Sequence, residues 1–526
     1  MDYLKISKAT DLSGRERRHY RILEILPGFL SWGTLLAILI FSYLSPVGTA
    51  IFIIIFDIYW LFLVLFLGVH LLVSYRGMRQ RLNVDWKQSC IDLGRRKLVR
   101  GEGEEARTLE LGWEDLWHVV IVPTYMEGIG VIRSTLDGLL NSDYPCERVI
   151  VVLATEGRAG PAGLERSQRI TQEYASRFGH FLVTIHPDDI SGELKGKGAN
   201  QAWAAAQLKR EIIDPLGLDY DHILVSVFDA DTVAHSGYFY CLAHSFLSCE
   251  KPYRSSFQPV PVYHNNLWQA PFFARVAAFS NTFWQMMQQL RPEKLATYSS
   301  HSMTWRALVD IGFWSTNMVS EDSRIFWHCF CYYKGDYIVQ PMYFPVSMDI
   351  CMDKSFVATA RNLYKQQRRW GWGVENIPYL LFNTNKQWKT LDGTARKKYL
   401  SHIIVQLYGF HSWATNAFIT SILGWLPIIL GGDRFNATVL SSNLPVVSKY
   451  LMTLAMVGMV LSAAISLLTL PAGDKPKPWK YVVMVVQWVF LPVVIILFGA
   501  VPGLEAQTRL MFGKYMGFWV TPKHRE

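Results

Sequence analysis

Charged residues are scarce in this chain: Asp, Glu, Lys and Arg make up 18% of its 526 residues, whereas soluble domains carry about a quarter. Cysteine is also rare, and seven cysteines are too few, and an odd number, for a disulfide scaffold. No internal repeat or low-complexity tract is present. In contrast, hydrophobic residues reach 50%, with 19 Trp, 25 Tyr and 29 Phe. This much buriable surface excludes a disordered or collagen-like chain and indicates contact with lipid.

Two hydrophobic runs near the N-terminal end are long enough to cross a bilayer as helices. Residues 25–44 and 50–73 reach or approach the roughly 20 apolar residues that such a helix needs. The connector at 45–49 permits only a tight turn, so the two runs predict a helical hairpin. A cleaved signal peptide is disfavoured because the first run is too long and a second follows at once.

Basic residues flank this hairpin and account for much of the net charge of +9. They are Lys5, Lys8, Arg15, Arg17, Arg18 and Arg21 on one side and Arg76, Arg79, Arg81, Lys87, Arg95, Arg96 and Lys97 on the other. The positive-inside rule predicts that both flanks, and the region as far as about Lys398, are cytoplasmic. Because the charge lies beside predicted spans, it suits anionic lipid, and no nucleic-acid partner is expected.

The central region has the pattern of a soluble α/β fold. Short apolar runs at 119–122, 149–153, 181–185 and 223–228 alternate with helix-like segments at 131–141, 163–178 and 199–213. This alternation predicts a parallel sheet with helices on both faces. Ligands of such folds bind at the carboxyl ends of the strands, so residues that follow each run are candidates for a site.

Hydrophobic runs return after residue 398, at 408–430, 451–470 and 481–499. Two plus three spans would leave the C-terminal end outside, yet Arg509, Lys514, Lys523, His524 and Arg525 favour the inside. The number of crossings therefore stays open: one run could be re-entrant, or an extra crossing could lie within 401–430.

These patterns divide the chain into six segments. They are a cytosolic N-terminal segment (1–24), the membrane hairpin (25–73), a basic cytosolic linker (74–116), the α/β domain (117–385), an interfacial segment (386–407), and a C-terminal membrane region of about three spans with a tail (408–526).

The strongest local motif is Asp229-Ala230-Asp231, which ends a hydrophobic strand. Alternate side chains of extended backbone point the same way, so Asp229 and Asp231 can converge on one hard cation. Mg²⁺ or Mn²⁺ held by one or two carboxylates, with substrate phosphates completing its shell, suits this pattern. The alternative is a strand-to-turn cap, because an isolated Asp-X-Asp is common.

Other segments add candidate ligands. Lys197 lies in a glycine-rich helix start at 196–200 and can meet a phosphate. Glu321 and Asp322 form an acidic pair, and the segment 366–370 combines Gln and Arg donors with a Trp ring. Each is weak alone, since the acidic pair also suits an ordinary helix N-terminus.

In this order the motifs resemble the inverting, membrane-integrated family 2 glycosyltransferases, the group that contains the cellulose, chitin and hyaluronan synthases. The signature of that group is Asp-X-Asp, then Thr/Ser-Glu-Asp, then Gln-X-X-Arg-Trp. It is matched at Asp229/Asp231, Glu321/Asp322 and Gln366/Arg369/Trp370. The resemblance covers residues 117–370 and implies a GT-A fold: a Rossmann-like α/β nucleotide-diphospho-sugar transferase domain in the cytosol, flanked by transmembrane helices.

The resemblance also implies a role for each matched residue. Asp229 and Asp231 would bind Mg²⁺ or Mn²⁺ and the donor diphosphate, with Asp231 on the metal. Asp322, beside Glu321, would be the general base that takes a proton from an acceptor hydroxyl. The remaining assignments are Gln366 and Arg369 on the diphosphate, Lys197 on the nucleotide, Trp370 stacked on the acceptor sugar, and Thr124, Tyr125 and Glu127 along the nucleoside pocket.

Some positions depart from the pattern of that group. In that group an acidic element after the second strand recognises the nucleotide base. Here residues 154–158 occupy its place, and only Glu156 is a substitute. The glycine-rich acceptor pocket is replaced by the bulkier segment 297–303, which suggests an acceptor unlike a plain cellulose end. Gln258 is a candidate sugar contact. Trp370 could instead anchor the chain at the membrane interface, and Arg368 is expected to meet solvent or lipid headgroups.

The resulting hypothesis is a multi-pass enzyme of the plasma (inner) membrane with a cytoplasmic catalytic domain. It would transfer a sugar from a nucleotide-diphosphate donor, UDP-linked by resemblance, to a growing β-linked polysaccharide. One alternative is transfer of a single sugar to a lipid-linked acceptor; a second is a non-catalytic glycan-binding or transport subunit. Membrane lipids are expected partners, and an accessory export subunit is compatible with the hypothesis.

The metal role of Asp231 can be tested by chelation. Excess EDTA should abolish sugar transfer by the purified protein, and added Mg²⁺ or Mn²⁺ should restore it, because the cation stabilises the leaving diphosphate. The measurement is incorporation of label from a radiolabelled nucleotide sugar. Full activity in excess chelator would refute the role given to Asp231.

Overall fold

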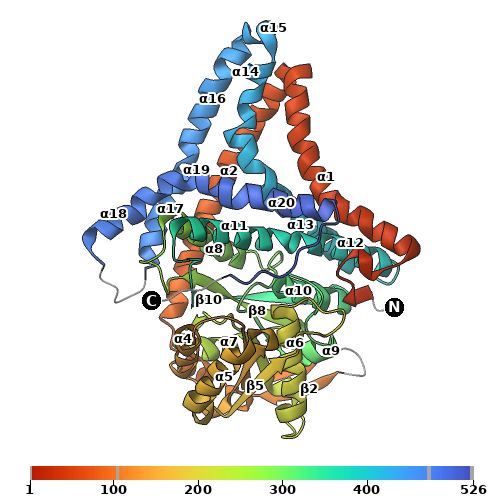
Figure 1. Cartoon of the computed structure of the whole chain (residues 1–526), viewed down its shortest axis with the longest axis vertical. Helices are drawn as coiled ribbons and strands as arrows, with labels where there is room; N and C mark the ends of the chain where they lie inside the picture. Colours follow the sequence, from red (N-terminus) through yellow and green to blue (C-terminus); the bar gives the residue numbers. More distant parts are fainter. Residues whose placement is uncertain (1–2, 102–105, 471–475, 522–526) are drawn as a thin grey trace.

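The computed structural model describes residues 3–101, 106–470 and 476–521. Figure 1 shows a lower domain built around a sheet and an upper group of long helices that rises away from it. The main sheet has eight strands in the order β5-β4-β3-β6-β9-β8-β10-β7. Their bounds are β3 Trp117–Thr124, β4 Val149–Glu156, β5 His180–His186, β6 Ile223–Val227, β7 Val233–Ala234, β8 Ser255–Tyr263, β9 Ser302–Thr304 and β10 Ile338–Met348.

The four apolar runs of the central region are all strands of this sheet. They correspond to β3, β4, β5 and β6, which pair in parallel, so the prediction of an α/β fold is confirmed. The sheet itself is mixed, which corrects the expectation of a parallel one. The short β9 begins at the carboxyl edge of β6 and runs back along it, antiparallel to both β6 and β8.

Helices cover both faces of the sheet, as the alternation predicts. Val120 and Val122 pack in a buried cluster with residues of α4, α5 and α7, whereas Val119 and Ile121 pack on the other face with α6, α9 and α10. The helices of this domain are α3 Trp86–Leu93, α4 Ile129–Leu140, α5 Gly160–Tyr174, α6 Lys197–Leu208, α7 Tyr238–Leu247, α8 Phe272–Gln289, α9 Trp305–Asp310, α10 Glu321–Tyr332, α11 Phe356–Gly371 and α12 Asn376–Gln387.

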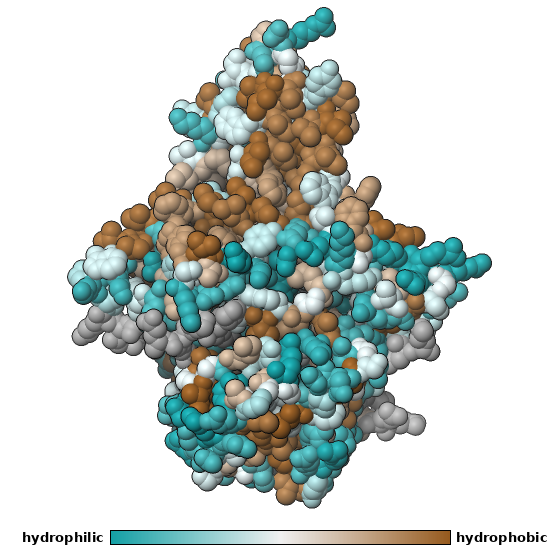
Figure 2. Space-filling view, in the orientation of Figure 1, coloured by the Kyte–Doolittle hydropathy of each residue, from teal (hydrophilic) through white to brown (hydrophobic). Residues whose placement is uncertain are grey.

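The N-terminal hairpin consists of α1 (Gly14–Leu44) and α2 (Pro46–Leu82). Only Ser45 separates them, so the turn is tighter than the predicted connector, because Pro46 starts the second helix with its fixed φ. In Figure 1 α1 and α2 rise beside α13 (Gly393–Ser421), α14 (Leu426–Leu430) and α16 (Val439–Ala455) to a tip at α15 (Gly432–Asn436). Figure 2 shows a mainly hydrophobic surface over these upper helices.

Four helices of the described residues are long and apolar enough to cross a membrane, or five if the bent pair Gly393–Ser421 and Leu423–Leu430 forms one span. The last of the four, Pro478–Met511, contains α18 (Pro478–Val486), α19 (Leu491–Ile495) and α20 (Val501–Met511). Figure 1 shows these elements running across the molecule, between the upper helices and the sheet domain. The predicted span at 481–499 therefore lies across the molecule, whereas the helices of the N-terminal hairpin rise away from the sheet domain.

A small antiparallel sheet of β1 (Arg96–Arg100) and β2 (Arg107–Leu111) is tied to the main domain by the buried carboxylate of Asp221. One oxygen accepts from Arg100 at 2.7 Å and the other from Arg306 Nε at 2.9 Å. Asp221 thus anchors the turn that leads into β6.

Replacing Asp221 with Ala should lower the melting temperature of the detergent-solubilised protein by about 4–8 °C. The loss leaves two arginines without their buried partner, at a cost of about 2 kcal/mol. A matched control is Glu173→Gln, which removes an exposed ion pair with Arg133 and should shift the melting temperature by about 1 °C or less. Equal shifts in both variants would contradict the anchoring role.

Candidate active site

The carboxyl ends of the central strands bring predicted site residues to one edge of the sheet. Thr124 ends β3, Glu156 ends β4, and Asp229 and Asp231 follow β6. Because β3 pairs with both β4 and β6 in parallel register, these residues share one edge. The hydroxyl of Thr124 is 3.3 Å from that of Thr155.

Lys197 is the centre of a charged cluster at this edge. Its Nζ is 2.7 Å from Asp229 Oδ1, 2.8 Å from Asp322 Oδ1 and 3.9 Å from Glu321 Oε1. Burial alone would lower the pKa of Lys197, but the nearby acidic groups, Asp229 and Asp322 foremost, outweigh burial and raise it. A buried, charged ammonium therefore joins the start of α6, the end of β6 and the start of α10.

Asp229 and Asp231 have different surroundings. Asp229 Oδ2 accepts a hydrogen bond from Ser299 Oγ at 2.5 Å. Asp231 is only 1% exposed, and its Oδ2 accepts from the backbone N–H of Asp349 at 3.1 Å. Within the described ranges, no group of three or more His, Cys, Asp or Glu side chains is placed to hold a metal ion.

Glu321 and Asp322 begin α10, directly after Ser320. Glu321 is buried, and burial together with the adjacent Asp322 carboxylate raises its pKa to about 8. Neither of its carboxyl oxygens has a hydrogen-bond partner among the residues that the structure describes. Glu321 is thus neutral near pH 7.

Helix α11 carries Gln366 and Arg369. The charge of Arg369 acts on Glu321, and its Nε is buried without a hydrogen-bond partner in the described part of the chain. Trp370 packs beside apolar residues of the buried cluster that joins α2 and α8 to the helices after α16. The structure thus brings Arg369 to the carboxylates and gives Trp370 an apolar environment.

Arg368, expected to meet solvent or lipid, instead pairs with Glu505 of α20 at 2.7 Å. Glu505 also accepts hydrogen bonds from Tyr364 at 2.7 Å and from Arg509 at 2.7 Å. The expectation for Arg368 is therefore wrong. Glu505 fixes α11, and no local pattern could identify this role because Tyr364 and Arg368 lie far from it in the sequence.

The C-terminal segment after α20 also lies at the site, which the sequence did not indicate. The guanidinium of Arg369 is 5.0 Å from the ring of Phe518, and Gln366 Nε2 is 3.5 Å from Thr521 Oγ1. Gly196 has φ +156°, and a Cβ there would lie 2.6 Å from Cγ of Phe518. The glycine before Lys197 is thus required for close contact with this segment.

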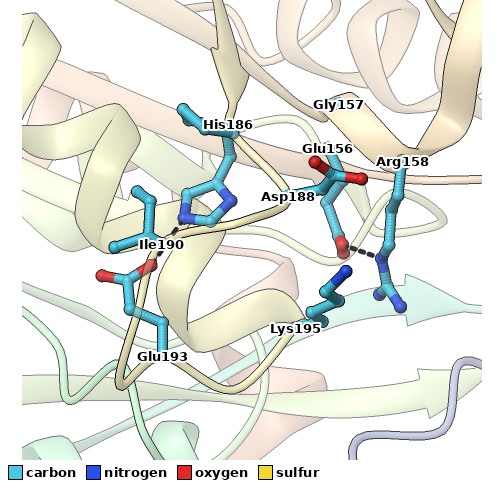
Figure 3. Close-up of a pocket in the computed structure, with 9 residues that line it drawn as sticks. Glu156, Gly157, Arg158, His186, Asp188, Ile190, Glu193 and Lys195 are labelled. Carbon is cyan, nitrogen blue, oxygen red and sulfur yellow. Dashed lines mark hydrogen bonds and ion pairs between the residues drawn. The ribbon is translucent and has the colours of Figure 1, made fainter.

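A pocket beside the cluster is lined by Glu156, Arg158, His186, Glu193 and Lys195, among others (Figure 3). Glu156 pairs with Arg158, and His186 Nε2 is 2.9 Å from Glu193 Oε2. The Arg158 guanidinium lies 4.1 Å from the centre of the Tyr125 ring. Glu156 at the end of β4 and Tyr125 after β3, both predicted site residues, therefore both contact Arg158.

Two further predicted residues have their polar atoms engaged by backbone. Glu127 Oε2 accepts from the Tyr125 N–H at 2.6 Å. Gln258 is fully buried; its Oε1 accepts from the Tyr298 N–H at 2.8 Å and its Nε2 donates to the Ser299 carbonyl at 3.2 Å. Gln258 therefore supports the segment that carries Ser299.

The raised pKa of Glu321 predicts a pH-dependent stability. Ionisation is easier in the unfolded chain, where the pKa is near 4.5, so the Glu321 contribution to stability falls as the pH rises from about 4.5 to 8. Glu321→Gln does not titrate, and its melting temperature relative to the parent should therefore be higher at pH 9 than at pH 5.5.

The control for this measurement is Glu165→Gln, because Glu165 forms an exposed ion pair with Arg169. Its melting temperature relative to the parent should stay nearly constant over the same range. A constant difference for Glu321→Gln as well would show that the Glu321 carboxyl titrates normally.

Comparisons with known proteins identify the family. A family described as glycosyl transferase family group 2 matches residues 224–501, more than half of the chain. No curated protein matches the chain. Among solved structures, it is similar to the mannosyltransferase PcManGT from Pyrobaculum calidifontis in complex with GDP-Man and Mn²⁺ (14% identity, 88% of this chain and 99% of that chain, TM-score 0.41). It is also similar to S. aureus TarS 1–349 in complex with UDP-GlcNAc (12% identity, 67% and 92%, TM-score 0.34). Because the family match covers more than half of its residues, this chain belongs to glycosyl transferase family group 2.

Proposed function

We propose that this protein is a membrane-bound, metal-dependent, inverting glycosyltransferase. It transfers a sugar from a nucleotide-diphosphate donor, a UDP-sugar by resemblance, to a growing β-linked polysaccharide at the cytoplasmic face. The observation that carries this proposal is the cluster of Lys197 with Asp229 and Asp322. It brings together the Asp-X-Asp motif at the end of β6, the acidic pair of α10 and the ammonium of Lys197, which can bind a phosphate.

The carboxylates of Asp229 and Asp231 fit a hard divalent cation. Asp231 is buried, and the Asp349 N–H orients one of its oxygens. Mg²⁺ and Mn²⁺ are commonly held by one or two carboxylates plus substrate phosphates rather than by a full protein cage. That preference agrees with the small number of protein ligands at the site. When bound, the cation would neutralise the charge that develops on the leaving diphosphate.

Asp322 is the proposed general base. It takes the proton of an acceptor hydroxyl as that oxygen bonds to the anomeric carbon and the bond to the diphosphate breaks on the opposite face. One base is sufficient for inversion. Glu321 is neutral near pH 7, whereas Asp322 contacts the Lys197 ammonium at 2.8 Å, so the two neighbouring carboxyl groups have separate roles.

Lys197 and Arg369 are the proposed diphosphate ligands, with Gln366 beside them. Lys197 Nζ contacts both Asp229 and Asp322, so a bound diphosphate competes with Asp322 for the same ammonium. Donor binding would thus release the base. Arg369 has a buried Nε without a partner in the described part of the chain, which suits an anionic ligand.

The pocket of Figure 3, which Glu156 lines, is the proposed nucleoside site. Thr124, Tyr125 and Glu127 are proposed as further nucleoside contacts at the same edge of the sheet. Arg158 lies between Tyr125 and Glu156. Trp370 and Gln258 are proposed on the acceptor side. Of these two, Gln258 would act through the backbone of residues 298 and 299.

The membrane arrangement supports catalysis at the cytoplasmic face. If α1, α2, the α13–α14 pair and the helix Val439–Leu468 cross the bilayer while α18–α20 lie along its surface, as their direction in Figure 1 suggests, the number of crossings is even. Arg509 and Lys514 then lie on the same side as the basic N-terminal segment. This removes the conflict between the predicted span count and the basic C-terminal residues.

Transfer of a single sugar to a lipid-linked acceptor is a second candidate. It is favoured by the small number of candidate spans in the described residues, four or five, which leaves few helices to enclose a polymer. Purified protein incubated with radiolabelled UDP-glucose, UDP-GlcNAc or GDP-mannose and Mg²⁺ or Mn²⁺ separates the two. A size ladder supports polymer synthesis, and a one-sugar lipid product refutes it.

Replacing Asp322 with Asn should reduce transfer by at least about 10³-fold, because the base is removed, while donor binding changes by about 3-fold or less. Binding is measured by titration with the labelled donor, and transfer by product formation. Asp336→Asn, which removes an ion pair with Lys251, is the control and should keep parental activity. Turnover of Asp322→Asn at the parental rate would disprove the assignment of Asp322 as the base.

A further inference from the structure

The segment Thr297–His301 is built around the catalytic carboxylates. Thr297 Oγ1 donates to the backbone carbonyl of Asp322 at 2.7 Å, and Ser299 Oγ donates to Asp229 at 2.5 Å. The carbonyl of His301 then accepts from the N–H of Val227, the last residue of β6, at 3.1 Å. Three contacts thus fix the segment between the proposed base and the proposed metal site.

The backbone of this segment is strained immediately before His301. Ser300 has φ +63°, in the left-handed region that only glycine adopts without cost. Its side chain is buried and held by Thr232, with 2.9 Å between the two hydroxyl oxygens. Such strain persists where the surroundings enforce it, and it concentrates at binding and catalytic sites. Here it sets the direction in which the chain enters His301.

The imidazole of His301 is held in one tautomer. The side chain is 1% exposed, and Nδ1 lies 2.9 Å from the carbonyl oxygen of Tyr298. Because a carbonyl only accepts, Nδ1 carries the proton. Burial lowers the pKa of His301, although Asp322 favours the charged form, so the ring is neutral and Nε2 has a free lone pair.

Nε2 has no hydrogen-bond partner among the residues that the structure describes. A buried acceptor without a partner is costly, and it needs an explanation. The charged groups that act on this ring are Asp322, Lys197 and Asp229, which form the cluster described above. The ring with the unsatisfied acceptor is therefore within electrostatic range of the proposed base and of the proposed diphosphate ligand.

We propose that His301 Nε2 accepts a hydrogen bond from a sugar hydroxyl bound beside Asp322, which makes His301 a residue that determines sugar specificity. This inference rests on the proposed glycosyl transfer. The ligand is a sugar with a free hydroxyl at that position, and the hydroxyl belongs either to the acceptor or to the sugar being transferred. A sugar without it leaves Nε2 unpaired and is rejected.

Two substitutions separate this role from a structural one. Asn can place an amide N–H near the position of Nδ1 and keep the bond to Tyr298, but it has no atom at the position of Nε2. Gln can place an amide oxygen near Nε2, but it loses the bond to Tyr298. His301→Asn should therefore fold normally and lose about 10-fold or more in kcat/KM, whereas His301→Gln should retain activity within about 3-fold.

The experiment uses the full-length protein with whichever of UDP-glucose, UDP-GlcNAc and GDP-mannose it turns over fastest. Transfer to acceptor and hydrolysis of donor in water are both measured, together with the melting temperature. Loss of transfer alone in His301→Asn assigns the hydroxyl to the acceptor. Equal loss of hydrolysis assigns it to the transferred sugar. In addition, deoxy analogues of that sugar should be discriminated by the parent and not by His301→Asn.

Parental kcat/KM in His301→Asn would overturn the inference while leaving the proposed function intact. A larger loss in His301→Gln than in His301→Asn, or a fall in melting temperature that parallels the activity of His301→Asn, would assign the ring a structural role and would also overturn it. A parent protein that turns over none of the three donors would instead contradict the proposed function and this inference together.

Discussion

The buried ammonium of Lys197 is the interaction on which the site depends. Desolvating a charge is costly unless opposite charges surround it, and here Asp229 and Asp322 contact Nζ directly. The ion pairs connect α6 to the end of β6 and to α10, and Lys197 and Asp322 lie 125 residues apart in the sequence. The same ammonium suits a phosphate, so in the proposed function a group that stabilises the fold of the site would also bind the donor.

The cluster around Lys197 is supported by helices that run across the molecule (Figure 1). Glu505 of α20 binds Arg368 and Tyr364 of α11, and α11 carries Arg369 toward the carboxylates. At the other end, Arg21 of α1 donates to the carbonyl of Leu510 at 2.8 Å, and the buried Glu24 accepts from the hydroxyl of Tyr515 at 2.9 Å. The first helix of the chain and its last described residues therefore support one another beside the site.

Local patterns were sufficient for much of the fold. The apolar runs became β3 to β6 because a strand covered on both faces must be hydrophobic throughout. The strands β9 and β7 could not be found, since they have three and two residues and owe their pairing to the main sheet. The motif residues Lys197, Asp229 and Asp322 do meet, whereas Glu505, Phe518 and Thr521 carry no signal of their own. Their positions follow from tertiary packing.

The central claim is that one base, Asp322, acts opposite a diphosphate held by Lys197 and Arg369, so that the sugar is inverted in a single displacement. The most direct test is the anomeric configuration of the product, determined by NMR on material made by the purified protein from an α-linked nucleotide sugar. The account predicts a β-linked product from the first turnover. An α-linked product would contradict it, because retention requires a second displacement that this arrangement of carboxylates does not provide.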